Sequence, residues 1–145
     1  MQVFIVGTPI ETAKALDGRR LQKQIVECEQ ILDAMRGKKA WSNHPCVLQY
    51  SYKDGYDWLV EYLYCLKSYK DGNYDVAQLY SDQAFLYKPN FHTQEYFDQM
   101  KRRLYSKNKE HYKQWAYLGE SEENWYYVDN EWRKYINGKR ILMKD

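Results

Sequence analysis

The sequence contains no apolar run long enough to cross a membrane, and its mean hydropathy is −0.88. A transmembrane helix needs about 20 predominantly apolar residues. The opening stretch, MQVFIVGTPI, is short and carries no basic residue, so it does not have the form of a secretory signal peptide. We therefore expect no membrane partner and a cytoplasmic location.

Cysteine is scarce and shows no pairing signal. The chain has three cysteines, Cys28, Cys46 and Cys65, which lie far apart and without paired spacing. Scattered cysteines of this kind are typical of reduced core thiols in a cytosolic protein. No cluster has the ligand spacing of a zinc site. We predict that the protein holds no metal and no cofactor.

A net charge of only +2 gives no strong field of one sign, but the charges are unevenly placed. Basic residues gather in four stretches, Arg19–Lys23, Arg36–Lys39, Lys101–Lys113 and Arg133–Lys144. Local basic patches permit phosphate contact without requiring it. The sixteen tyrosines and five tryptophans suit a core, and they are also side chains on which nucleobases stack.

The clearest periodic signal lies in LDGRRLQKQIVECEQILDAM, residues 16–35. Its apolar residues recur at helical spacing and share one face. Glu27 lies at the edge of that face, with Lys23 one turn before it and Arg20 two turns before it. Two interpretations stay open. Glu27 is a surface partner of Lys23, or it is a carboxylate kept ionised by two cations at the border of the core.

Capping residues, glycines that end helices and the spacing of apolar residues together predict where the helices lie. One helix is predicted over residues 11–36, capped by Thr8 or Thr12, loosened near Gly18 and ended by Gly37. Further helices are predicted over residues 56–69, 76–87 and 93–106, with a short one before Gly119. Residues 1–6 fit a brief strand or an extended arm packed on the core.

The stretch KKAWSNHPC places Trp41, Asn43 and His44 together in a turn ordered by Pro45. Two interpretations of this turn are equal. Trp41 plugs the core while the other two bond to backbone, or all three line a pocket near the first helix. The run Lys101–Arg103 is similarly open, because it suits either the dipole at a helix C-terminus or a phosphate-binding patch.

The segment after residue 120 has the weakest pattern. Residues 125–128 suit an extended conformation, and Asn137-Gly138 is a turn signal that would fit a last hairpin. We predict an irregular aromatic C-terminal segment, with residues 120–145 as an appended or mobile tail. The fold class predicted for residues 1–145 is mainly α: a compact single-domain helical fold with a short extended N-terminal arm.

Three segments resemble the pyrimidine-dimer DNA glycosylase family. LDGRRLQKQIVECEQIL is similar to the family's D-x-x-RL-x-KQ-x-VE-x-x-QIL helix. WSNHPCV is similar to its W-x-NHP-x-V loop, and KNKEHYKQW to its R-K-x-x-E-H-Y or P-x-W-Y-K-Y-Y ending. Together they cover most of residues 1–118, while the segment after residue 120 has no clear counterpart. The resemblance implies an almost wholly helical, compact domain.

The resemblance also implies a reaction. In the family an N-terminal α-amine attacks C1′ of the damaged nucleotide, and a glutamate on the first long helix assists β-elimination of the Schiff base. The glutamate corresponds to Glu27, and His44 falls in the NHP loop. The chemistry suits these groups, because an α-amine with a pKa near 8 is roughly a tenth neutral at pH 7. A nearby carboxylate can then move protons.

Three positions depart from the family pattern. Gln2 is too large for ordinary removal of the preceding methionine, so the reactive amine is assigned to Met1. Two family arginines near the glutamate, which help to hold DNA, correspond here to Val26 and Gln30. These departures allow the fold to persist while excision of dimers is lost.

Three functions remain in view. The first is a DNA-repair-type glycosylase and AP lyase acting on pyrimidine nucleotides in DNA. The second is an inactive member of the fold that binds a nucleotide or nucleic acid, for example a phage counter-defence protein that sequesters a nucleotide signal. The third is an interaction protein with buried aromatic faces; oligomeric state stays open. The predicted catalytic residues are Met1 and Glu27, and the predicted nucleotide- or DNA-binding residues are Arg19, Arg20, Lys23, Gln24, Trp41, Asn43, His44, Arg102 and Arg103.

Overall fold

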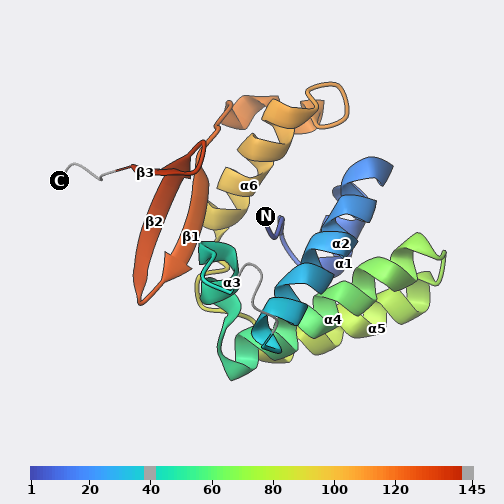
Figure 1. The fold of residues 1–145 in the computed structure, drawn as a ribbon. Helices are drawn as coiled ribbons and strands as arrows, with labels where there is room; N and C mark the ends of the chain where they lie inside the picture. Colours follow the sequence, from blue (N-terminus) through green and yellow to red (C-terminus); the bar gives the residue numbers. More distant parts are fainter. Residues whose placement is uncertain (38–41, 142–145) are drawn as a thin grey trace.

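The structure, a computed structural model, describes residues 1–37 and 42–141. An extended N-terminal arm, residues 1–7, leads into a set of helices, and a small sheet follows them (Figure 1). The elements in chain order are α1 (Pro9–Ala15), α2 (Gly18–Met35), α3 (Pro45–Tyr50), α4 (Lys53–Lys70), α5 (Tyr74–Ala84), η1 (Phe85–Tyr87), α6 (Gln94–Lys107), η2 (Lys113–Leu118), β1 (Asn124–Val128), β2 (Glu131–Ile136) and β3 (Lys139–Ile141).

The first predicted helix is in fact two helices. The Thr8 hydroxyl accepts a hydrogen bond from the Glu11 N–H, and the Glu11 carboxylate accepts one from the Thr8 N–H, so α1 begins earlier than predicted. Leu16 is extended, with φ −68° and ψ 138°, which ends α1 before α2 starts. The Tyr112 hydroxyl accepts from the Asp17 N–H at 3.0 Å and holds this break. The prediction of one helix over residues 11–36 is therefore wrong.

The other long helices lie where their patterns place them. The predictions over 56–69, 76–87 and 93–106 correspond to α4, to α5 with η1, and to α6, each within a few residues. The six-residue α3 is predicted only as a turn, because a helix this short shows no periodicity. The mainly α class is confirmed. No helix in the described ranges is long and apolar enough to cross a membrane.

The residues after 120 form a sheet rather than an irregular segment. In the described part of this region, three antiparallel strands follow the order β1-β2-β3. Both turns have two residues with positive φ, 54° and 61° at Asp129-Asn130 and 49° and 77° at Asn137-Gly138, as in type I′ hairpins. The predicted turn at Asn137-Gly138 is confirmed, and the predicted irregular segment is wrong. The sheet escapes prediction because β1 buries bulky side chains on both faces, so its sequence does not alternate.

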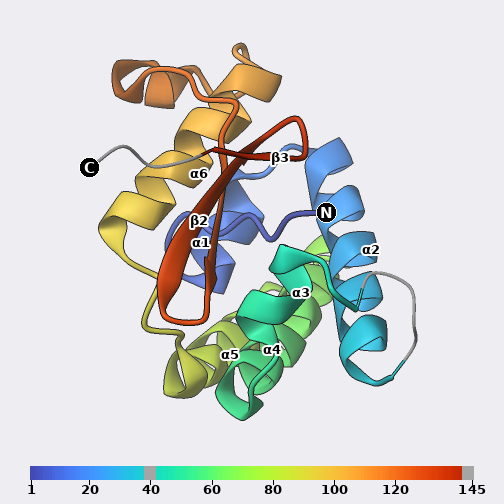
Figure 2. The ribbon, with the colours of Figure 1, turned by 60° about the vertical axis from the view of Figure 1, so that its left-hand side comes forward.

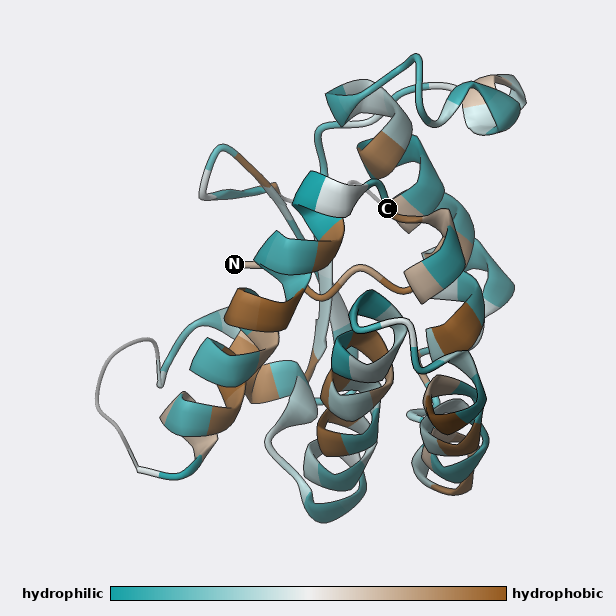
Figure 3. Cartoon of the chain, turned by 90° about the vertical axis from the view of Figure 1, so that its right-hand side faces the viewer, coloured by the Kyte–Doolittle hydropathy of each residue, from teal (hydrophilic) through white to brown (hydrophobic). Residues whose placement is uncertain are grey.

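One hydrophobic cluster joins the arm, the helices and the sheet. It includes Val3 of the arm, Ile31 of α2, Trp58 of α4, Leu104 of α6 and Tyr126 of β1. Figure 3 shows the apolar arm running between helices that carry apolar and polar residues on different faces. β1 shares this cluster, so this strand packs on the core together with the arm and the helices. In Figure 2 the sheet lies toward the viewer, and the N-terminus lies beside α2.

Candidate functional site

The N-terminal arm is held by side chains that act as a neighbouring strand would. The Gln24 side-chain oxygen accepts from the Phe4 N–H, and its amide nitrogen donates to the Gln2 carbonyl at 2.8 Å. The Tyr62 hydroxyl donates to the Phe4 carbonyl. Gln24 is only 2% exposed and does not line the cleft described below, although the sequence predicts that it contacts a nucleotide or DNA. Its amide is used to position the arm.

A cleft of about 420 Å³ opens beside the first residues of the arm. Its walls come from the arm, α2, the start of α3, the C-terminal half of α6 and the sheet, which meet around the N-terminus (Figure 1). Its lining residues are Met1, Gln2, Phe4, Arg20, Lys23, Glu27, His44, Pro45, Arg103, Lys107, Asn124, Tyr126, Tyr135 and Gly138. Most of the predicted site residues are therefore brought together.

Glu27 lies on the α2 wall of the cleft, and its side chain is 13% exposed. One carboxylate oxygen accepts from the Gln2 N–H at 3.2 Å. The other lies 4.0 Å from the Lys23 ammonium, which is itself largely exposed. Both sequence interpretations are thus partly met. The ion pair exists but is long, and the closer partner of the carboxylate is the backbone of the arm.

The Met1 amine shares the cleft with this carboxylate. Backbone bond lengths keep the Met1 nitrogen within about 4.3 Å of the Gln2 nitrogen, and the Gln2 nitrogen is itself bonded to Glu27. Met1 and His44 both line the cleft. Burial, and then the positive charge of the amine, lower the pKa of the His44 imidazole. The Tyr126 hydroxyl donates to the Met1 carbonyl at 3.1 Å, which fixes the first residue.

Four cations line the cleft, Arg20, Lys23, Arg103 and Lys107, and among the described residues Glu27 is the one carboxylate that faces them there. Of the described carboxylates, none lies within 4.0 Å of a side-chain nitrogen of Arg20, Arg103 or Lys107. Partial burial lowers the pKa of Lys107, and the charges of Arg103, Arg20 and Lys23 lower it further, although Lys107 keeps wide contact with solvent. Cations that repel one another in this way form a site for an anion.

Two side chains of the cleft have buried polar atoms without partners. Arg103 is 8% exposed, and its Nη1 donates to the Glu122 carbonyl at 2.9 Å. Its Nε is buried and has no hydrogen-bond partner among the described residues. Gln2 is 5% exposed, and its Oε1 likewise lacks a partner in that part of the chain. Native structures leave few such groups unsatisfied.

The remaining predicted residues lie elsewhere. Arg19 and Asn43 are exposed and do not line the cleft, so the structure gives them no place in it. Arg102 also lies off the cleft, because its Nε donates to the Leu118 carbonyl at 2.9 Å and braces η2 against α6. Trp41 lies outside the described residues. Val26 is 43% exposed on α2 and does not reach the cleft.

Sequence reasoning identifies Arg103 on α6 but misses Lys107 and the residues of the sheet that line the cleft. Lys107 stands within a predicted basic stretch, which is its only signal. Tyr126 and Tyr135 are two of sixteen tyrosines, and nothing local distinguishes them. The Tyr126 ring meets the His44 ring edge to face, with centroids 5.7 Å apart, and Tyr135 packs against Tyr126 at 5.6 Å. The cleft therefore has an aromatic wall opposite its carboxylate-bearing helix.

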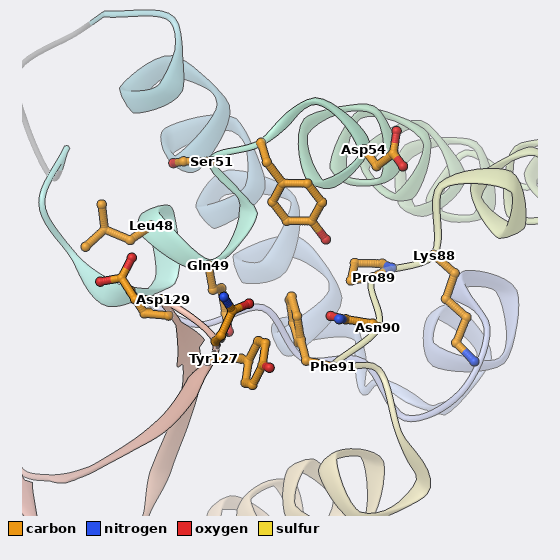
Figure 4. A pocket seen from close by; sticks show the side chains of 13 residues that line it. Leu48, Gln49, Ser51, Asp54, Lys88, Pro89, Asn90, Phe91, Tyr127 and Asp129 are labelled. Atoms are coloured by element: carbon orange, nitrogen blue, oxygen red, sulfur yellow. Dashed lines mark hydrogen bonds between the residues drawn. The ribbon is translucent and has the colours of Figure 1, made fainter.

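A second depression is larger but chemically different. This polar groove, of about 650 Å³, lies between α3, the segment before α6 and the β1–β2 turn. Figure 4 shows Asp54, Lys88 and Asp129 around it, with Phe91 and Tyr127 at its centre. Its buried amide is satisfied, because the Gln49 Oε1 accepts from the Tyr127 N–H at 3.1 Å. Among the described residues, no group of three or more His, Cys, Asp or Glu could hold a metal ion in this groove or elsewhere.

Comparison with known proteins links the cleft to a family. Residues 1–69 match the family model described as pyrimidine dimer DNA glycosylase. Comparisons with curated proteins and with solved structures give no match. The matched residues include the arm, Glu27 and His44, and they end before α6 and the sheet. The part of the chain that supplies the amine and the carboxylate of the cleft, residues 1–69, is thus similar to the pyrimidine dimer DNA glycosylase family.

Proposed function

We propose that the protein is a DNA glycosylase with AP lyase activity, which acts on pyrimidine nucleotides in DNA through the Met1 amine and Glu27. The observation that carries the proposal is the shared cleft of these two groups. The hydrogen bond from the Gln2 N–H to Glu27, at 3.2 Å, keeps the amine beside the carboxylate. The family match over residues 1–69 gives the same type of activity.

The chemistry follows from the two groups. The neutral amine attacks C1′ of the nucleotide, the bond from C1′ to the base breaks, and the base leaves with that electron pair. The nitrogen then loses a proton, its lone pair forms the double bond to C1′, and the C1′–O4′ bond breaks, so that O4′ leaves as a hydroxyl by taking up a proton. The protonated Schiff base that results makes the C2′ proton acidic, and Glu27 is the carboxylate that we propose accepts it. An α-amine supplies far more neutral nucleophile near pH 7 than a lysine does, because its pKa lies near 8.

The surroundings of the pair suit a nucleotide drawn out of a duplex. A cleft of about 420 Å³ has the size of a site for one small ligand. The aromatic wall of Tyr126 and Tyr135 provides apolar surface for a base or sugar, and the four cations suit the backbone. Extrusion of a nucleotide costs a few kcal/mol, which such contacts offset.

Borohydride trapping tests this function. Purified protein is incubated with abasic duplex and with ultraviolet-irradiated duplex in the presence of borohydride, and adducts are mapped by mass spectrometry. We expect a covalent adduct on the Met1 nitrogen, and no adduct after the α-amine is acetylated. An adduct on a lysine would overturn the role of Met1, and the absence of any adduct would overturn the lyase. An adduct on Gln2 of chains that have lost Met1 would transfer the role of the amine to Gln2.

A second function has a specific observation in its favour. Val26 and Gln30, at the positions of two family arginines, are exposed on α2 and give that surface no positive charge. A protein that binds a nucleotide without reaction would need only the cleft. Nucleoside mono- and diphosphates should then raise the melting temperature, while affinity for duplex DNA would be weak. A duplex-acting enzyme should instead bind DNA with a steep dependence on salt.

A further inference from the structure

A third cavity, here called the arm pocket, has a volume of about 330 Å³ and shares no lining residue with the cleft. Both cavities use the N-terminal arm. Met1, Gln2 and Phe4 line the cleft, whereas Val6 and Gly7 line the arm pocket. The other walls of the arm pocket come from α1, α4, α5, η1 and α6. A volume of this order is sufficient for one small organic ligand.

Two buried aromatic rings of the arm pocket each have a ring nitrogen that the fold leaves unpaired. Trp58 is 2% exposed and His92 is 3% exposed, and their ring centroids lie 4.5 Å apart. The Trp58 Nε1 and the His92 Nδ1 make no hydrogen bond among the described residues, and neither is a fully buried atom. Both nitrogens therefore open to the pocket that their rings line.

The His92 ring presents a hydrogen-bond donor to the arm pocket. Burial, followed by the charge of Lys88, lowers the pKa of His92 to about 3, so the imidazole is neutral near pH 7. Its Nε2 lies 2.8 Å from the hydroxyl of the fully buried Tyr50. A buried hydroxyl needs an acceptor, so we assign the hydroxyl proton to the bond with Nε2 and the imidazole proton to Nδ1.

Ser81 of α5 adds a third donor to the arm pocket. The side chain is buried, and its Oγ accepts a hydrogen bond from the Ile10 N–H at 3.0 Å. Its own hydroxyl proton has no acceptor among the described residues. An indole N–H, an imidazole N–H and a hydroxyl thus line one pocket without acceptors from the fold. Such donors favour a ligand that is rich in acceptor oxygens.

The charges around the arm pocket favour an anion. Lys88 and Lys101 line it, and Glu11 is the one carboxylate among its described lining residues. The Glu11 carboxylate already accepts hydrogen bonds from the N–H and the hydroxyl of Thr8. The Lys101 ammonium lies 3.9 Å from the Asp98 carboxylate. In the described part of the chain, no carboxylate lies within 4.0 Å of the Lys88 ammonium, so that charge is open to a ligand.

Apolar side chains complete the lining of the arm pocket. Val6 and Pro9 are buried, Phe97 is half-buried, and Phe85 is exposed. An inorganic anion would leave this apolar surface unused, and an uncharged apolar ligand would leave the donors and the lysines unused. The lining therefore suits a molecule with one anionic end and an apolar body.

We propose that the arm pocket binds a small organic carboxylate with an aromatic or other apolar body, whose oxygens accept hydrogen bonds from Trp58, His92 and Ser81. A carboxylate can accept about four hydrogen bonds, so it can pair with all three donors. Lys88 and Lys101 supply the opposite charge, and the ligand body packs against the apolar lining. This site is separate from the cleft and does not depend on the activity proposed there.

Titration of the full chain with sodium benzoate, followed by NMR of the ¹⁵N-labelled protein, tests the site. The indole N–H resonance of Trp58 is identified by its absence in Trp58→Phe or, should that variant not fold, by through-bond assignment. We expect benzoate to shift this resonance with a Kd of about 1 mM. Benzamide has the same shape without the charge and should bind about tenfold more weakly or worse.

Two variants separate the donors from the charge. Ser81→Ala removes one donor, and Lys88→Gln removes one cation; each should weaken benzoate binding by about threefold to tenfold. Lys14→Gln is the matched control, because Lys14 is exposed on α1 and lies outside the pocket, and it should bind as wild type does. Melting curves verify folding. Lys88 is exposed, so its variant tests the site even if Ser81→Ala does not fold.

Four results would overturn the assignment. No shift of the Trp58 resonance at about 20 mM benzoate would mean that the pocket holds only water. Equal affinities for benzoate and benzamide would exclude a carboxylate site. Equal weakening in Lys88→Gln and Lys14→Gln would reduce the effect to general charge. Shifts at Tyr126 without a shift at Trp58 would place benzoate in the cleft instead.

Discussion

The cleft beside the N-terminal arm and the polar groove differ chiefly in the charge of the side chains that line them. The groove is the larger, about 650 Å³ against about 420 Å³, yet its charged lining is Asp54 and Asp129 against Lys88. The cleft sets four cations and the N-terminal amine against Glu27. A groove of balanced or negative charge gives a nucleic acid no attraction. The charge of the lining residues therefore distinguishes the two regions better than volume does.

The two regions also differ in how their buried polar atoms are satisfied. Beside the groove, the amide oxygen of Gln49 accepts a hydrogen bond from the backbone N–H of Tyr127 in β1. In the cleft, Arg103 and Gln2 keep buried atoms without partners among the described residues. Stability favours the first arrangement, and the second is what a binding site retains until its ligand arrives.

The largest expected difference between the regions is catalytic. Replacing Glu27 by Gln keeps the shape of the side chain but removes the base, so cleavage of abasic duplex should fall by about 10²–10⁴-fold. The matched change in the groove, Asp54→Asn, should leave the rate as it is. Strand-cleavage kinetics with both variants decide the matter. Equal rates in Glu27→Gln and wild type would remove Glu27 from the reaction.

Two buried glutamines, Gln24 beside the cleft and Gln49 beside the groove, allow the stability of the two regions to be compared. Gln24→Leu leaves the Phe4 N–H and the Gln2 carbonyl unpaired, and we expect a loss of about 2–4 kcal/mol in the free energy of unfolding. Gln49→Leu leaves the Tyr127 N–H unpaired, with an expected loss of about 1–3 kcal/mol. Urea unfolding measures both. Only Gln24→Leu should also slow cleavage per folded molecule, because it releases the arm; an equal slowing in both would contradict the positioning role.

We expect acid to lower the free energy of unfolding through the buried imidazole of His92. His92 is 3% exposed, its Nε2 is hydrogen-bonded to the Tyr50 hydroxyl, and burial followed by the charge of Lys88 lowers its pKa to about 3. The unfolded chain then binds a proton at higher pH than the folded chain does. Stability is complete above about pH 6.5 and falls as the pH drops toward 3, by about 2 kcal/mol between pH 8 and pH 5.

Thermal or urea unfolding at several pH values, with His92→Gln beside wild type, isolates this contribution. The variant should show a shallower dependence over the same range. His44 in the cleft also has a lowered pKa, so its effect has the same sign. If wild type and His92→Gln have parallel profiles, the imidazole does not titrate as its burial requires.

The smallest expected effect concerns salt. Arg20 lines the cleft and Lys88 lines the groove. If duplex DNA lies over the cleft, Arg20→Gln should reduce the slope of log affinity against log salt by about 1, and Lys88→Gln should not alter it. Fluorescence anisotropy between about 50 and 200 mM salt measures the slope. A larger change in Lys88→Gln would place the DNA on the groove instead.

Sequence patterns within a single helix are sufficient to predict the half of the candidate site that lies on α2. Apolar spacing places the helix, and the sequence alone identifies Glu27 at its border, with Arg20 and Lys23 beside it. Those relations depend on residues three or four positions apart, which a helix fixes. Helical spacing does not predict the role of Gln24. This polar residue on the apolar face of α2 is hydrogen-bonded to the arm, about 20 residues earlier in the chain.

The other half of the site cannot be derived locally. Lys107, Tyr126 and Tyr135 reach the cleft because α6 and the sheet pack against the arm, and that packing is set by contacts distant in sequence. β1 buries Trp125, Tyr126 and Val128 on both faces, so the alternation that marks a half-exposed strand is absent. The break before α2 depends likewise on Tyr112, far along the chain.

The arm described above also constrains how the molecule assembles. Residues 2–4 are synthesised first, yet their hydrogen-bond partners come from Gln24, Tyr62 and Met100, and Tyr126 secures the residue before them. Contacts so distant in sequence form late, since long loops must close before they can form. The arm thus completes its contacts only after β1 has been synthesised, and a nascent chain halted before β1 would lack the Tyr126 wall of the cleft.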